Sequence, residues 1–202
     1  DSVPAMVGVG RSLTLRGKPD AAIELLRKAA KADPKDAPAR RAIAECLAAQ
    51  GKPVEARREL EQAAKLDPKD PLTTRLLVEI LVTAGDTGSA GKVAETYQRA
   101  NPKSALGDFL RAVVHEKLAN LKAAEESYEA ALAKDAKFLD AHKNLAILLV
   151  GDNPGYRDPE KAERAMAHFE KYFSLGGRDK ELRRIYDEIK AQFDAKKKEG
   201  EK

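Results

Sequence analysis

The histidines and the single cysteine are the residues of this chain whose types could support metal binding or catalysis. The histidines are His115, His142 and His168, and no two are four residues apart, the spacing common for metal ligands on one helix face. Cys46 is the only cysteine, so neither an internal disulfide nor a cysteine-based zinc site can form. The sequence contains no glycine-rich phosphate loop and no catalytic-triad spacing. We therefore expect no enzymatic activity, no metal and no cofactor.

A second candidate is the segment GDNPGYRD, from Gly151 to Asp158, which is rich in turn-forming and polar residues. Its spacing does not match that of a calcium-binding loop, so we interpret it as a turn extension. Because exposed loops often carry binding residues, a partner contact through Tyr156 and Arg157 is the alternative.

Arg111 and His115 lie four residues apart at positions that are mostly apolar elsewhere in the chain. An unpaired buried arginine would cost several kcal/mol, so we expect the Arg111 guanidinium to reach the surface or the Asp108 carboxylate. The alternative is that the two residues mark a weak joint or a contact site. Cys46 alternates with core positions and is expected to be a small buried residue.

The elements that must position these residues follow a repeat of 34 residues. The segments Gly17–Gln50 and Gly51–Ala84 are identical at 15 of 34 positions. A chain that copies itself at this interval is a repeat array, in which each unit buries its apolar side against the next. The repeat must therefore be interpreted before any local motif.

Columns of residues spaced by 34 indicate a helix, a tight turn, a second helix and a stop. Glycine in the turn allows a backbone conformation that other residues adopt at a cost, and proline ends the second helix. Small alanines are expected where the two helices cross closely. The glycine column is Gly17, Gly51 and Gly85, the alanine column is Ala22, Ala56, Ala90 and Ala124, and the proline column is Pro34, Pro68 and Pro102.

These columns resemble the tetratricopeptide repeat family. The resemblance implies an all-α, right-handed superhelical solenoid of about five helix–turn–helix units. The expected array covers residues 1–177, with units near 3–36, 37–70, 71–104, 105–138 and 139–177. The fourth unit lacks the turn glycine and the closing proline, and the fifth has four extra residues in its turn. Residues 178–202 are expected to form a capping helix and a charged tail.

Composition narrows the classes of partner. The chain has 37 basic and 33 acidic residues, and the two signs are interspersed rather than gathered on one face. Nucleic-acid binding is therefore not expected, and no apolar run is long enough to insert directly into a membrane. We expect a soluble protein of the cytoplasm or the periplasm. Because the chain begins with Asp1 and enters a repeat almost at once, we expect a fragment or a processed chain.

The family resemblance also implies a concave groove, lined by the first helix of each unit, where peptides or helices bind. We expect the groove to be charged in its first half and apolar in its second, although the apolar residues could instead pack between units. Arginine–glutamate pairs four residues apart could equally be ordinary helix-surface ion pairs. The expected groove residues are Arg11, Arg41, Glu45, Leu72, Arg75, Glu79, Leu106, Phe109, Val113, Lys143 and Ile147.

The leading interpretation is a non-catalytic scaffold or adaptor that binds a peptide or helix of a partner protein in this groove. The paired lysines and asparagines with which some family members clamp chaperone C-termini are missing. The alternative is a structural spacer or self-assembling segment of a larger bacterial envelope, secretion or motility protein, with a homo-oligomer in place of a partner.

Overall fold

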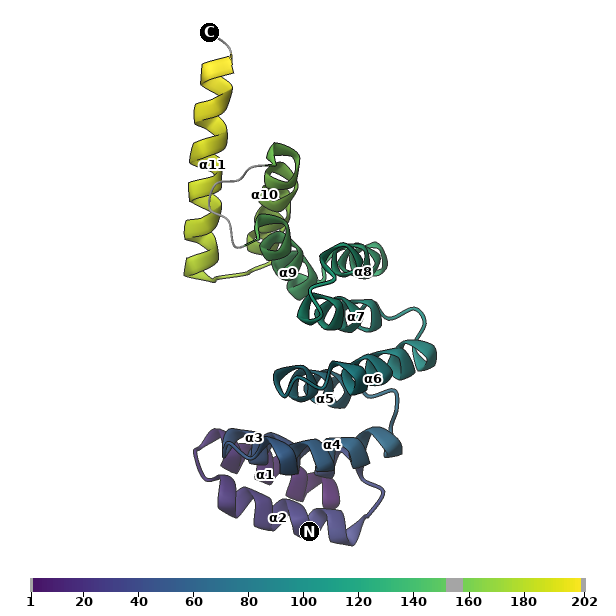
Figure 1. Cartoon of the computed structure of the whole chain (residues 1–202). Coiled ribbons are helices and arrows are strands. Elements are labelled where there is room, and N and C mark those ends of the chain that lie inside the picture. The colour runs from purple at the N-terminus through teal and green to yellow at the C-terminus, as the bar shows by residue number, and fades with distance from the viewer. Residues whose placement is uncertain (1, 152–157, 201–202) are drawn as a thin grey trace. The chain divides into compact units, whose positions relative to one another are not determined.

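The computed structural model describes residues 2–151 and 158–200, which form eleven α-helices and no strand (Figure 1). This confirms the predicted all-α fold. The helices are α1 (Val3–Leu15), α2 (Pro19–Ala32), α3 (Ala37–Ala49), α4 (Pro53–Leu66), α5 (Pro71–Thr83), α6 (Thr87–Ala100), α7 (Ala105–Lys117), α8 (Leu121–Lys134), α9 (Leu139–Val150), α10 (Pro159–Ser174) and α11 (Lys180–Gly200).

Short polar side chains determine where many of the helices begin. A side-chain oxygen at the N-cap accepts a hydrogen bond from a backbone N–H of the first turn, which would otherwise be unpaired. Proline often follows, because a first-turn residue needs no N–H. The capping residues are Ser2, Asp36, Asp70, Asp86, Ser104 and Asp158.

The turn inside each hairpin has the predicted backbone conformation. Gly17, Gly51 and Gly85 have φ angles of 72°, 71° and 79°, in the left-handed region. Ala119 replaces glycine in the fourth hairpin, yet it keeps φ at 57° and the same pair of backbone hydrogen bonds to the end of α7. A side chain in this region is strained by roughly 1 kcal/mol, so the surrounding helices hold the turn in place of glycine.

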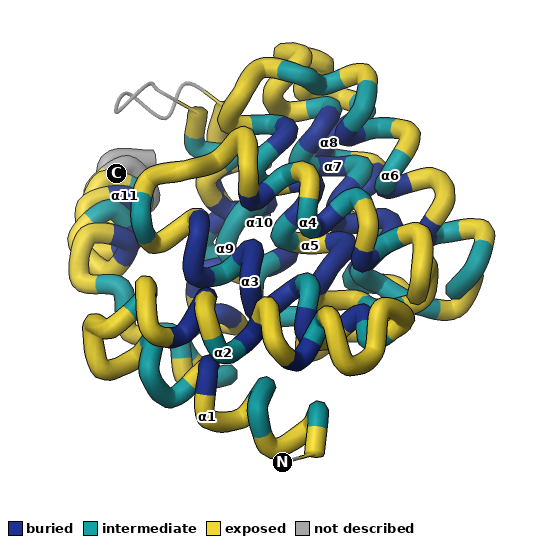
Figure 2. Tube along the Cα trace, turned by 90° about the horizontal axis from the view of Figure 1, so that it is seen from below, coloured by how far each residue is buried: buried dark blue, intermediate teal, exposed yellow. Residues whose placement is uncertain are grey.

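The chain divides into two compact units, Asp1–Pro102 and Lys103–Lys202. In the N-terminal unit each odd-numbered helix packs against the next as a hairpin, and α3 contacts α1, α2 and α4. Buried residues accordingly run along most of α3 (Figure 2). Cys46 is 1% exposed and shares a hydrogen bond of 2.8 Å with the Thr14 hydroxyl, which confirms its predicted burial. The alanine column is fully buried where the hairpins cross: Ala22, Ala56, Ala90 and Ala124.

The C-terminal unit contains the hairpins α7–α8 and α9–α10, followed by α11. Helix α11 packs against α10 through a stripe formed by Leu182, Tyr186 and Ile189, which are all buried. The Tyr186 hydroxyl also donates a hydrogen bond of 2.6 Å to Glu170 of α10. Covering α10 in this way removes apolar surface that would otherwise be exposed to water.

Candidate functional site

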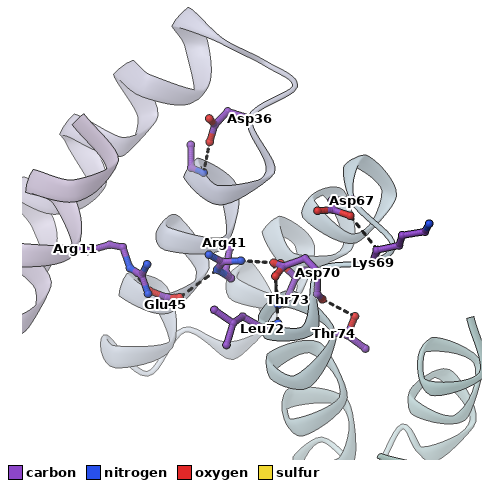
Figure 3. A network of polar contacts seen from close by, with 11 residues as sticks. Arg11, Asp36, Arg41, Glu45, Asp67, Lys69, Asp70, Leu72, Thr73 and Thr74 are labelled. Atoms are coloured by element: carbon purple, nitrogen blue, oxygen red, sulfur yellow. Dashed lines mark hydrogen bonds and ion pairs between the residues drawn. The ribbon is translucent and has the colours of Figure 1, made fainter. Parts of the chain in front are cut away.

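A chain of charged side chains links the three odd-numbered helices of the N-terminal unit (Figure 3). Arg11 of α1 lies 3.3 Å from Glu45 of α3, and Arg41 of α3 lies 3.5 Å from the same glutamate. Arg41 also pairs with Asp70, the residue that caps α5. Arg41 is only 9% exposed, so this cation lies largely out of water with two carboxylates beside it.

Asp70 is the residue that sequence reasoning missed in this network. It accepts backbone hydrogen bonds from Leu72 and Thr73, both at 3.2 Å, a further bond from the Thr73 hydroxyl, and the Arg41 ion pair. Burial opposes ionisation of Asp70, but the Thr73 hydrogen bonds and the Arg41 charge outweigh it and lower the pKa of the carboxyl below its ordinary value. The aspartate that closes each DPKD segment just before a helix was the available signal.

The other predicted residues of this unit form an exposed strip on α5. Leu72 is 50% exposed, and its backbone N–H donates to the Asp70 carboxylate that also pairs with Arg41 (Figure 3). Arg75 and Glu79 follow at helical spacing and are also exposed. We call Arg11, Arg41, Glu45, Leu72, Arg75 and Glu79 the first-helix surface. It combines an apolar side chain with charges of both signs, and part of it is held in place by the network.

In the C-terminal unit the structure corrects the prediction for Phe109. Its side chain is 5% exposed, and its ring lies 5.0 Å from that of Phe138 and 5.8 Å from that of Tyr128, measured between centroids. Phe109 is therefore part of the core, and its ring is not available to a partner. The column pattern could not reveal this, because the aromatic residues that surround Phe109 belong to other columns.

The remaining predicted residues of this unit are more accessible. Leu106 and Val113 are half-buried, and Ile147 is 39% exposed. Lys143 lies 3.8 Å from Asp179, at the start of α11. The structure therefore offers only a short apolar strip here, rather than the apolar half-groove that the sequence predicted.

A partly buried hydrogen-bond network joins α7, α8 and α9. The hydroxyl of fully buried Tyr128 donates to Glu116 at 2.7 Å and accepts from the Asn144 amide at 3.1 Å. Burial and the Glu116 carboxylate raise the pKa of Tyr128 far above its ordinary value. Tyr128 stands in a column with Leu26 and Leu60, so the appearance of a hydroxyl at a core position was a signal for a hydrogen-bond partner.

His142 and His168 lie side by side, with their ring centroids 5.2 Å apart and their ring planes tilted by 40°. The Nδ1 atoms of His142 on α9 and His168 on α10 are 2.9 Å apart, a proximity that their separation of 26 residues in the sequence did not indicate. His142 Nε2 lies 3.1 Å from the Ala136 carbonyl oxygen, which can only accept. In the neutral pair, His142 therefore donates from Nε2 and accepts at Nδ1 from His168.

Charging this pair is unfavourable. Burial, then His142 and Arg164, lower the pKa of His168 to about 4. Burial also lowers the pKa of His142, with Lys171 adding to the effect, while the Ala136 carbonyl and Asp135 oppose it. Because the unfolded chain takes up these protons near pH 6.5 and the folded chain does not, the pair's contribution to stability is complete above that pH and is lost as the pH falls toward 4.

We therefore expect the C-terminal unit to become easier to unfold between pH 7.5 and pH 5. Urea denaturation followed by far-ultraviolet circular dichroism should show a lower midpoint at pH 5, and His168→Phe should flatten this difference. His115→Gln, on a helix that carries neither member of the pair, is the matched control and should keep it. An unchanged pH dependence in His168→Phe would contradict this assignment.

The Arg111 expectation is confirmed. Its guanidinium lies 3.6 Å from Asp108, which is 3% exposed and also pairs with Lys134 at 2.5 Å. Among the residues that the structure describes, no three histidine, cysteine or acidic side chains gather as a metal site would require. The predicted loop contacts Tyr156 and Arg157 lie outside the described residues.

The tetratricopeptide repeat family model matches residues 13–72 and 47–112, overlapping segments that together run from the end of α1 into α7. The chain belongs to the tetratricopeptide repeat (TPR) family. No curated protein matches its sequence.

Solved TPR structures share this fold. The thermophilic TPR protein TTC0263 of Thermus thermophilus superposes with a TM-score of 0.70 at 23% identity, over 93% of this chain and 98% of that one. Pseudomonas aeruginosa pilF superposes with a TM-score of 0.76 at 18% identity, over 96% and 86%. YrrB, described as a TPR protein with an unusual peptide-binding site, superposes with a TM-score of 0.58 at 18% identity, over 90% and 89%.

Within the described part of this TPR chain, no helix has the length and apolar character needed to cross a lipid bilayer. Its longest helix, α11, is instead amphipathic and packs one face against α10.

Proposed function

We propose that this protein is a scaffold or adaptor that binds a peptide or helical segment of a partner protein along the first-helix surface. The observation that carries the proposal is the ion-pair network that joins α1, α3 and the start of α5 beside an exposed leucine. The family membership and the resemblance to a TPR protein described as having a peptide-binding site support it.

Pre-organisation makes this surface suitable for recognition. Arg41 is held between Glu45 and Asp70, so its guanidinium loses little conformational freedom when a ligand arrives. Binding costs are lower when the side chains are already ordered. Arg11 and Arg75 remain exposed at the same surface and can pair with acidic groups of a segment lying across it.

Leu72 is the natural apolar anchor point of the surface. It is half exposed on α5, next to charged residues that would form the polar rim of an interface. Binding energy in protein interfaces is concentrated in a few such buried contacts, surrounded by polar groups that exclude water. A partner segment with an apolar side chain between charged ones would match this arrangement.

We expect Leu72→Glu to weaken partner binding about tenfold or more while leaving the fold unchanged, because a charge would replace the apolar contact. Partners captured from the native lysate by the wild-type chain would be identified, purified and titrated against the variant. Val54→Glu is the matched control, since Val54 is 65% exposed on α4, outside the first-helix surface. Equal losses in the two variants, or no loss in Leu72→Glu, would contradict the proposal.

Self-assembly remains the alternative prediction. Light scattering across a concentration series distinguishes the two, because growth of the wild-type chain without any partner would favour a spacer or self-assembling segment. In that case Leu72→Glu would change the concentration dependence instead of the affinity for another protein.

A further inference from the structure

A pocket opens in the N-terminal unit between α4, α5 and α6. Its volume is about 380 Å³, and most of its lining is apolar. Buried Leu77 and Tyr97 line it together with the more accessible Ala64, Pro68 and Val93. No residue of the first-helix surface lines this pocket, so it is a separate feature.

Comparison with the preceding repeat explains why the pocket is open. Thirty-four residues before Thr74 and Val93 stand Arg40 and Glu59, whose side chains form an ion pair of 3.2 Å between α3 and α4. Thr74 and Val93 are shorter and cannot form such a bridge between α5 and α6. The ion pair that joins α3 and α4 therefore has no counterpart between α5 and α6.

Tyr97 adds a second departure at the same place. It occupies the column of Ala29, Ala63 and Ala131, which are all fully buried. In the fifth unit, after the four extra residues of the turn, the same column holds Phe169. A tyrosine at such a close crossing prevents the neighbouring helices from approaching as they do around alanine. Its ring is 5% exposed and becomes part of the pocket lining. We call this site the Tyr97 pocket.

The charges around the Tyr97 pocket are unbalanced. Glu61 is the one acidic residue of the lining, and it pairs at 2.7 Å with Arg57, which also pairs with Asp86 at 3.0 Å. Lys65 and Lys92 also line the pocket, both are exposed, and neither forms an ion pair with any residue that the structure describes. An apolar cavity with two unpaired ammonium groups beside it is complementary to an apolar side chain that has carboxylates next to it.

We propose that the Tyr97 pocket is a second docking site, which takes an acidic peptide segment of a partner and buries one large apolar side chain of that segment. The apolar side chain packs against Leu77, Val93 and the Tyr97 ring. Aspartates or glutamates on either side pair with Lys65 and Lys92. The site does not depend on the first-helix surface, so it would stand even if binding at that surface were disproved.

The test uses the whole isotope-labelled chain and the capped peptide Asp-Asp-Phe-Asp-Asp, titrated while amide and methyl resonances are recorded. We expect saturable shifts centred on Leu77, Val93 and Tyr97. A peptide with alanine in place of phenylalanine, and one with lysines in place of the aspartates, should each bind at least tenfold more weakly. Equal affinity for the alanine peptide, or the absence of localised shifts, would overturn the proposal.

Two variants of the chain examine the same site. Lys65→Glu/Lys92→Glu reverses the rim charges, and Thr74→Arg/Val93→Glu installs the ion pair of the preceding repeat across the cleft. Each should weaken peptide binding about tenfold, whereas Lys18→Glu/Lys52→Glu, in the turns before α2 and α4, should not. Wild-type affinity in Lys65→Glu/Lys92→Glu would overturn the proposal. Because both lysines are exposed, this variant still tests the site if Thr74→Arg/Val93→Glu fails to fold.

Discussion

The Phe109→Ala variant is expected to lose about 3–5 kcal/mol of its free energy of unfolding, because removing a buried aromatic ring leaves a cavity that the core fills only in part. Phe109 contacts the rings of Tyr128 and Phe138, and Tyr128 is itself fully buried. Urea denaturation followed by circular dichroism measures this loss.

Ile147→Ala is the matched control for Phe109→Ala. Ile147 was predicted for the same groove and is 39% exposed, so its truncation should cost less than about 1 kcal/mol. If Phe109→Ala kept the wild-type stability and weakened partner binding, the ring would be accessible after all, and the original prediction for this residue would be reinstated.

The Asp70→Ala variant is expected to cost about 2–4 kcal/mol, more than the loss of a helix cap alone. The change removes the cap of α5, worth about 1 kcal/mol. It also removes the Asp70 partner of the largely buried Arg41, which keeps only its ion pair with Glu45 at 3.5 Å. Breaking a buried ion pair is strongly destabilising. The measurement is the free energy of unfolding at pH 7.

Asp36→Ala provides the control, because Asp36 caps α3 in the same position of the preceding repeat. The residue that matches Arg41 in the repeat before is Val7, so no arginine corresponds to the one that pairs with Asp70. Asp36→Ala should therefore cost only about 1 kcal/mol. Equal costs for the two variants would show that the Arg41–Asp70 pair adds nothing to stability.

The cost of Asp70→Ala in free energy of unfolding should depend on pH, because the pKa of Asp70 is lowered in the folded chain. A carboxyl whose pKa is lower in the folded chain stabilises that chain at a pH above its unfolded pKa of about 3.9, and this stabilisation is lost as the pH falls further. The difference in free energy of unfolding between the wild-type chain and Asp70→Ala should therefore become smaller at acidic pH.

The repeated helices and turns of this fold were predictable because each column holds the residue type that the local backbone or packing requires. Alanine is required where two helices cross, and the alanine column is indeed fully buried. Glycine suits a left-handed turn, and the helices keep that turn even where Ala119 replaces it. Arg111 was correctly expected to reach the surface or Asp108, because an unpaired buried cation is costly and a carboxylate lay a single helical turn away.

The features that the repeat pattern failed to predict depend on contacts between residues of different columns, which a repeat alignment does not show. His142 and His168 meet because α9 packs against α10, although 26 residues separate them. Phe109 was assigned by its column to a surface, but Phe138 and Tyr128 enclose it. The Tyr97 pocket arises from three coincident changes, at Thr74, Val93 and Tyr97, each of which lies in a different column.

The environment of Cys46 has a practical consequence for measuring the motions of this protein. The thiol is 1% exposed, and burial raises its pKa against the effect of the Thr14 hydrogen bond, so it forms the reactive thiolate less readily than a free cysteine. A cysteine introduced at an exposed position such as Val54 would therefore be alkylated far faster. Fluorescent or spin labels can then be attached at chosen sites, and distances within each unit can be followed, while the native cysteine stays in place.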